Sequence, residues 1–298
     1  MAENRLLTGP RIGFGAMQLP GPGVWGPPKD RTAALAVLRR AVDIGVTHID
    51  TADFYGPHVA NDLIREALHP YPAGLTIATK VGAQRDDQRR WLPAASPAEL
   101  RAQVESNLTR LGVDRLDLVY LRTGGEGAVM PPSDTPFLDS FRALADLRAE
   151  GLIAELGLSG VGKDQLAQAN EVAPVVAVQN LFHLLDRTDA DVLAVCEERG
   201  IAFVPYFPLA AGLLKPVPDT TRLPADAAPT AEQQRVLDEV ADRHGASRSQ
   251  TALAWLLARS PVIIAIPGTT SVAHLEENVA ATRVELTGED VARLTALA

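Results

Sequence analysis

Short apolar runs rich in β-branched residues alternate along the chain with longer segments whose apolar positions recur every three to four residues. The short runs are typical of strands buried in a parallel sheet, and the longer periodic segments are typical of amphipathic helices. The pattern predicts strands at 47–50, 75–79, 117–121, 153–158, 175–179, 201–205, 262–266 and 282–286. It predicts helices at 31–44, 59–68, 97–111, 136–150, 163–171, 188–199, 232–244, 247–259 and 272–280.

Eight strands alternating with helices fit either a closed (β/α)8 barrel or an open doubly wound α/β sheet. Several helix ends carry their own signals, such as Ser96 followed by Pro97 and then by Glu99, which predicts a capping box. Glycines stand where helices are expected to end, at 45, 112, 151, 200 and 245. No linker divides the chain, so we expect a single domain over residues 1–298. The proline-rich segment 215–230 is expected to form a loop over a site.

Composition and charge exclude several classes of protein. Lys and Arg number 28 against 37 Asp and Glu, a net charge of −9 that disfavours nucleic acid as a partner. The single Cys196 lies in an apolar helical pattern, which predicts a buried thiol and excludes a cysteine-based metal site. The uncharged run 200–214 is too short to cross a bilayer, and the first residues show no secretory signal. We therefore expect a cytoplasmic protein with no metal and no membrane partner.

Polar residues close six consecutive predicted strands. They are Asp50, Lys80, Arg122, Ser159, Gln179 and Tyr206. In an α/β barrel these strand ends meet on one face, which carries the active site. Lys80 is one of only four lysines among the 28 basic residues, which indicates a need for a compact, titratable ammonium. The pattern therefore predicts a polar site that includes Lys80.

Seven segments, in order from Gly13 to the C-terminus, together resemble the landmarks of the aldo-keto reductase superfamily. They read GFGAMQL, HIDTADFYG, IATKVG, LGVDRLDLVYL, VAVQN, VPYFPLAAG and IPGTTSVAHLEEN. The resemblance implies a single (β/α)8 TIM barrel and a nicotinamide cofactor, NADPH or NADH, bound without a Rossmann domain. It also implies reversible reduction of a small aldehyde or ketone.

The resemblance further implies that Tyr55 is the proton donor, with Lys80 and Asp50 beside it. A tyrosine titrates near 10, and an adjacent ammonium is expected to lower its pKa toward neutrality. Arg122 stands where the family usually has a catalytic histidine. It is expected either to pair with an acidic group on the substrate or to turn outward to a loop residue, Glu126 or Asp134.

Cofactor contacts implied by the resemblance fall after the strands and in the last third of the chain. They are Gly15, Met17, Asp50, Ser159, Gly160, Gln179, Tyr206, Phe207, Leu209, Gly212, Gly268, Thr269, His274, Glu277 and Asn278. The family usually has asparagine at Gly160, and many relatives have Lys and Arg at Gly268 and His274. The choice between NADPH and NADH therefore stays open.

Three other histidines lie near the expected site. His48 is expected to be a hydrogen-bonded core residue, and His58 and His183 to be polar loop residues or substrate contacts. Two function classes remain. Intact Asp50, Tyr55 and Lys80 favour a carbonyl reductase, whereas Arg122 and Gly160 favour a catalytically weak cofactor-binding regulatory protein on the same barrel.

Overall fold

The computed structural model describes residues 4–124, 130–210 and 229–298, which form two compact units. One unit comprises Gly13–Gln179 and Gly268–Val272, and the other comprises the chain up to Ile12 together with Asn180–Pro267 and Ala273–Ala298. Apart from Pro229 and Thr230, the predicted loop at 215–230 lies outside the described residues. None of the described helices is both long enough and apolar enough to span a membrane.

A parallel sheet forms the centre of the first unit, and its strands follow one another in chain order. The strands are β1 (Phe14–Gly15), β2 (His48–Asp50), β3 (Thr76–Arg85), β5 (Leu116–Arg122), β6 (Ile153–Ser159) and β7 (Val175–Gln179). A further strand, β4 (Trp91–Ala94), pairs antiparallel with the end of β3. The sequence predicted neither β1 nor β4, and it ended β3 at residue 79, six residues before the observed end.

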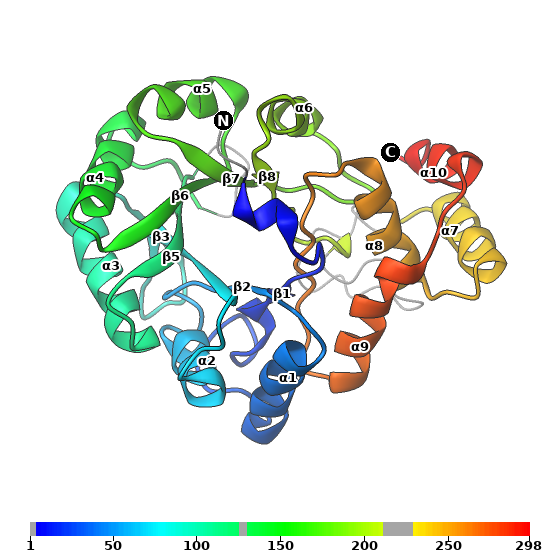
Figure 1. Ribbon diagram of the computed structural model, residues 1–298, viewed down its shortest axis with the longest axis horizontal. Coiled ribbons are helices and arrows are strands. Elements are labelled where there is room, and N and C mark those ends of the chain that lie inside the picture. The colour runs from blue at the N-terminus through cyan, green and yellow to red at the C-terminus, as the bar shows by residue number, and fades with distance from the viewer. Residues whose placement is uncertain (1–3, 125–129, 211–228) are drawn as a thin grey trace. The chain divides into compact units, whose positions relative to one another are not determined.

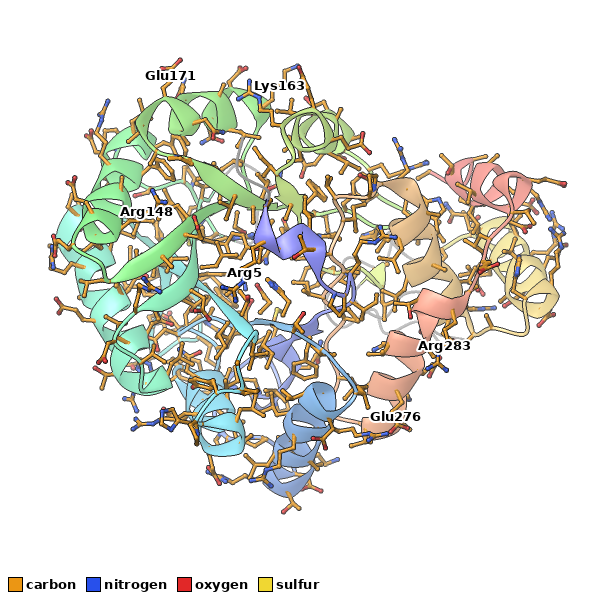
Figure 2. All side chains as sticks on the ribbon, viewed as in Figure 1. Arg5, Arg148, Lys163, Glu171, Glu276 and Arg283 are labelled. Carbon is orange, nitrogen blue, oxygen red and sulfur yellow. The ribbon has the colours of Figure 1, made fainter. Side chains whose placement is uncertain are left out.

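Five helices accompany this sheet, each within about two residues of its prediction. They are α1 (Arg31–Asp43), α2 (Val59–Leu68), α3 (Pro97–Leu111), α4 (Phe137–Ala149) and α5 (Lys163–Val172). Figure 1 shows α2 to α5 along the outer side of strands β2 to β7. Lys163 and Glu171 mark the two ends of α5 in Figure 2. The predicted capping box of α3 is confirmed, and Gly112 ends that helix with φ of 70°.

The second unit is mainly helical. It contains α6 (Ala190–Arg199), β8 (Ala202–Phe203), α7 (Ala231–Arg243), α8 (Arg248–Arg259), α9 (Val272–Ala280) and α10 (Gly288–Thr295), with short 3-10 turns at Arg5–Thr8 and Ala281–Arg283. The predicted strand at 282–286 is wrong, because a 3-10 turn occupies its start. The predicted strand at 262–266 is reduced to two isolated bridges, Ile263 with Phe203 and Ala265 with Ile12. Cys196 is buried as predicted, and burial raises the pKa of its thiol to about 12.

Candidate active site

A buried ion pair joins Asp50, the last residue of β2, to Lys80 in the middle of β3. Lys80 Nζ donates to Asp50 Oδ1 at 2.5 Å and to the carbonyl oxygen of Thr51 at 3.0 Å. Both charged side chains are only 4 % exposed. Burial by itself lowers the pKa of Lys80, but Asp50 and Tyr55 outweigh it and the pKa is raised. Lys80 is therefore a charged ammonium at neutral pH.

Tyr55 lies beside this ammonium, with Lys80 Nζ 4.9 Å from the centre of its ring. The side chain is buried, and burial is the largest influence on its pKa. Lys80 and, more weakly, Arg122 lower the pKa of Tyr55, but burial and Asp50 prevail and the pKa is raised. The expectation that Lys80 brings this pKa toward neutrality is therefore wrong for the protein alone. The phenol carries its proton at neutral pH.

The turn that carries Tyr55 is closed by Asp53 and His58. His58 N donates to the carbonyl oxygen of Asp53 at 2.7 Å, and His58 Nδ1 lies 2.9 Å from Asp53 Oδ1. Ser106 on α3 donates to Asp53 Oδ2 at 2.7 Å. The bond to Asp53 raises the pKa of His58, whose backbone has a left-handed φ of 68°. His58 thus stabilises the turn around the candidate proton donor.

A second polar network, missed from the sequence, lies behind the ion pair. Thr51 Oγ1 donates to Asn61 Oδ1 at 2.8 Å, and Asn61 Nδ2 donates to Asn107 Oδ1 at 2.9 Å. Thr79 Oγ1 donates to the same Asn107 oxygen at 2.6 Å. All four residues are fully buried. The network links Thr51, which follows Asp50, to Thr79, which precedes Lys80. In the sequence, only two asparagines within apolar helical patterns indicate it.

Three further strand-end side chains belong to the same cluster. The strand register places Arg122 beside Ser159, and Ser159 beside Gln179. Gln179 Nε2 donates to Asp50 Oδ2 at 2.7 Å, and Arg122 Nη1 donates to Ser159 Oγ at 2.9 Å. The first unit therefore brings together five of the six polar residues that the sequence predicted at strand ends, although β3 continues five residues beyond Lys80.

Gly160 follows this cluster with a left-handed φ of 76°. A Cβ atom there would lie 3.7 Å from Arg122 Nη1 and 3.3 Å from the carbonyl oxygen of Thr123. A longer side chain at this position would therefore compete with the Arg122 guanidinium for space. Glu126, one of the two outward partners considered for Arg122, lies outside the described residues.

Among the remaining cofactor candidates of the first unit, Gly268 lies against Gly15. A Cβ atom on Gly268 would stand 2.6 Å from the carbonyl oxygen of Gly15, closer than any side chain tolerates. Any side chain at position 268 would therefore require the Gly15 backbone to shift. Thr269 Oγ1 accepts a bond from the Ser271 amide at 3.1 Å, and Met17 is half-buried in a 3-10 turn after β1.

The other candidates belong to the second unit. Tyr206 and Phe207 make an edge-to-face contact at 5.4 Å, and Phe207 has a φ of 55°. On α9, His274 is exposed and Asn278 is buried, while the Glu277 carboxylate accepts a bond from Ser247 Oγ. Leu209 is half-buried in the turn after Phe207, whereas Gly212 lies outside the described residues.

Two of the other histidines differ from expectation. His48 is buried, but within the described chain neither ring nitrogen has a hydrogen-bond partner, so the prediction of a bonded core histidine is wrong. Burial lowers the pKa of His48 to about 4, which keeps the ring neutral. His183 is also buried, its pKa is lowered to about 4, and its Nδ1 accepts a bond from the Leu185 amide at 3.2 Å. His183 therefore shapes its own turn.

Comparison with known proteins places this cluster in context. The sequence model of the Aldo/keto reductase family matches residues 11–298. A pyridoxine 4-dehydrogenase from Escherichia coli is 47 % identical over 287 residues, which cover 95 % of this chain and 93 % of that protein. A glycerol dehydrogenase structure from Gluconobacter oxydans superposes with a TM-score of 0.82 at 28 % identity, covering 96 % and 90 % of the two chains. The structure of an aldo-keto reductase from Klebsiella pneumoniae in complex with NADPH superposes with a TM-score of 0.73 at 28 % identity, covering 97 % of this chain and 90 % of that chain.

These similarities extend over nearly the whole chain. They confirm the α/β fold class predicted from the sequence, the (β/α)8 TIM barrel. They also confirm the resemblance that the ordered sequence segments indicated. The expectation of a single domain and the roles of individual residues stay predictions.

Proposed function

The chain belongs to the aldo/keto reductase family, and from that premise we propose that it reduces a small aldehyde or ketone with NADPH, using Tyr55 as the proton donor. The observation that carries this proposal is the buried Asp50–Lys80 pair beside the Tyr55 ring. Burying two charges is costly unless they are paired. A charged lysine next to a phenol in such a place favours a role in proton transfer.

The residues at the ends of β6 and β7 fit a nicotinamide. Its carboxamide needs partners that both donate and accept hydrogen bonds, and a hydroxyl and a side-chain amide meet that need. Ser159 and Gln179 supply these groups from paired positions on neighbouring strands, and both are buried. Gln179 also donates to Asp50, which links the cofactor contact to the ion pair. When bound, NADPH supplies the hydride.

Tyr55 acts on the substrate oxygen. As the carbonyl carbon is reduced, its oxygen becomes an alkoxide that takes the proton from the Tyr55 hydroxyl. The resulting phenolate is stabilised by the Lys80 ammonium, which Asp50 keeps charged. Because the pKa of Tyr55 is raised, the donor is loaded at neutral pH, which favours the direction of reduction. Oxidation of an alcohol by the same site requires the phenolate, and higher pH favours it.

Pyridoxal is the leading candidate substrate. The Escherichia coli relative is named for oxidation of pyridoxine at its 4-position, and the reverse reaction reduces the 4-aldehyde. Pyridoxal carries a ring hydroxyl that ionises readily, which gives Arg122 an anionic partner. The influence of Arg122 on the pKa of Tyr55 supports a position within reach of the reacting groups. Arg122 thereby serves substrate recognition in place of a histidine.

The test follows NADPH consumption by the purified protein with pyridoxal and with aliphatic, aromatic and charged aldehydes, and identifies the product alcohol. We expect turnover with pyridoxal above that with neutral aliphatic aldehydes. NADPH binding without turnover of any carbonyl compound would instead support the regulatory alternative. Equal rates with NADH and NADPH would contradict the proposed preference for NADPH, whereas the proposed carbonyl reduction with Tyr55 as proton donor would still hold.

A further inference from the structure

We propose that Trp91, Phe54 and Trp25 form an aromatic wall that selects substrates with a planar aromatic ring, and that Arg85 fixes this wall in position. The inference rests on the proposed function, because it names the side chains that choose among carbonyl substrates. These four residues come from the loop after β1, the turn after β2 and the hairpin of β3 and β4.

The aromatic side chains form an unbroken series that starts at the proton donor. The Phe54 ring meets the Tyr55 ring edge-to-face at 5.4 Å, and it meets the Trp91 ring in the same manner at 5.4 Å. Tyr55 and Phe54 are 5 % and 6 % exposed, whereas Trp91 is half-exposed. The series therefore leads from the buried phenol out to an indole that a ligand can reach.

The backbone of Trp25 pairs with that of Gly56, the residue after Tyr55. Gly26 N donates to the carbonyl oxygen of Gly56 at 2.7 Å, and Gly56 N donates to that of Val24 at 3.2 Å. The loop after β1 is thereby bonded to the residue next to Tyr55. Of the three tryptophans in the chain, Trp91 contacts the residue before Tyr55 and Trp25 pairs with the residue after it.

Arg85 connects the two indoles. Its guanidinium carbon lies 4.3 Å from the centre of the Trp91 ring and 5.3 Å from that of Trp25. Its nitrogens donate to the carbonyl oxygens of Val24 at 3.2 Å and of Arg89 at 2.9 Å. A cation between two aromatic faces is attracted to both. The guanidinium is therefore suited to positioning the hairpin and the loop against each other.

A wall of this composition discriminates by ring type. An aromatic ring stacks or packs edge-on against an indole and gains more than its buried area alone provides, whereas a puckered saturated ring does not. Simple core packing of the hairpin predicts no such difference, because either ring would fill the space alike. Benzaldehyde and cyclohexanecarbaldehyde form a matched pair for this comparison, since they differ only in the ring.

The experiment measures kcat/KM for both aldehydes in the parent and in Trp91→Leu and Trp91→Phe. The two aldehydes differ in intrinsic reactivity, so the readout is how each substitution changes their ratio. Trp91→Leu is expected to lower kcat/KM for benzaldehyde by about tenfold and for cyclohexanecarbaldehyde by much less, and Trp91→Phe to restore most of the loss. Arg85→Gln is expected to raise KM for benzaldehyde several-fold while kcat changes little.

Tyr71→Leu is the control, because Tyr71 is a half-buried aromatic residue that precedes the start of β3 and donates to the carbonyl oxygen of Leu111 at the end of α3, and it should leave the ratio unchanged. Saturation-transfer NMR with benzyl alcohol and cyclohexylmethanol measures binding without turnover, so failure of the proposed reaction leaves the wall testable. Loss of benzyl alcohol binding in Trp91→Leu would support the wall even then. Equal changes for both rings in Trp91→Leu, by rate or by binding, would overturn it.

Discussion

Replacing Asp50 with asparagine removes the counter-ion of a buried ammonium while preserving the shape of the side chain. Lys80 Nζ lies 2.5 Å from the carboxylate, and both side chains are 4 % exposed. Breaking a buried pair by removing one partner costs about 3–5 kcal/mol. Neutralising a lysine of ordinary pKa at pH 7 costs up to about 4.6 kcal/mol, at 1.36 kcal/mol per unit, which bounds the loss from above. We therefore expect Asp50→Asn to lower the free energy of unfolding by about 3–4.6 kcal/mol at pH 7.

The pH dependence gives this prediction its sign. In the parent, the folded-state pKa of Lys80 is raised, so its stabilising contribution is complete below the unfolded pKa near 10.4 and is lost only as the pH rises through the folded value. In Asp50→Asn, burial is left to dominate and the pKa of Lys80 falls below its unfolded value. The stability deficit should then shrink to about 1–2 kcal/mol at pH 9.5, where neutralising the lysine costs little.

The assay is chemical denaturation of parent and Asp50→Asn at pH 7 and pH 9.5. Glu66→Gln is the matched control, because it breaks the Arg31–Glu66 pair, whose side chains are 56 % and 42 % exposed. Exposed pairs contribute little to stability, so this control should behave like the parent at both pH values. An Asp50→Asn deficit no larger than that of Glu66→Gln, or one that is the same at both pH values, would refute the reasoning.

Three further predictions concern side chains around the site. Arg122→Leu should lower kcat/KM for pyridoxal by about thirtyfold, the loss of one charge-assisted bond of roughly 2 kcal/mol, and for a neutral aldehyde much less; equal losses would remove the anion from its role. In the parent, the free energy of unfolding should decline by less than about 1 kcal/mol as the pH rises through the raised pKa of His58. His58→Asn should abolish this decline, and asparagine tolerates the left-handed backbone at this position. Denaturation across that range measures this decline, and an unchanged slope would show that another group causes it. His274→Arg should tighten NADPH binding several-fold relative to NADH by calorimetry, and a proportional change for both would show that position 274 does not contact the 2′-phosphate.

The helices and the central strands were predictable because their signals are local. The capping box of α3 needs only Ser96 and Glu99, and it is present as predicted. The sequence did not predict β1, because two residues are too few to show a periodicity. It did not predict β4, because the pairing of this strand depends on the hairpin with β3 rather than on its own sequence. The sequence did not predict α10: its start carries a cap signal at Thr287 and Asp290, but no apolar period of sufficient length follows it.

The sequence predicted which side chains lie together in the site, but it did not predict the hydrogen bonds between them. The prediction that polar strand ends meet on one face brought Asp50 and Lys80 together, and the two side chains do bond, although Lys80 lies inside β3. The bond from Gln179 to Asp50 depends on side-chain directions across strands far apart in sequence. The raised pKa of Tyr55 depends on burial, which outweighs the charge of its neighbour. Such balances between burial and charge arise only when the tertiary structure is known.

The central claim is that Tyr55 donates the proton in an NADPH-dependent reduction, and the most direct measurement is the turnover of Tyr55→Phe. The substitution removes one hydroxyl and leaves the ring contacts with Phe54 and Lys80 in place. We expect kcat to fall by at least ~100-fold, the usual worth of general acid catalysis, while NADPH affinity by fluorescence titration stays within a few-fold of the parent. A Tyr55→Phe protein that binds NADPH normally and reduces its aldehyde at close to the parent rate would contradict the assignment.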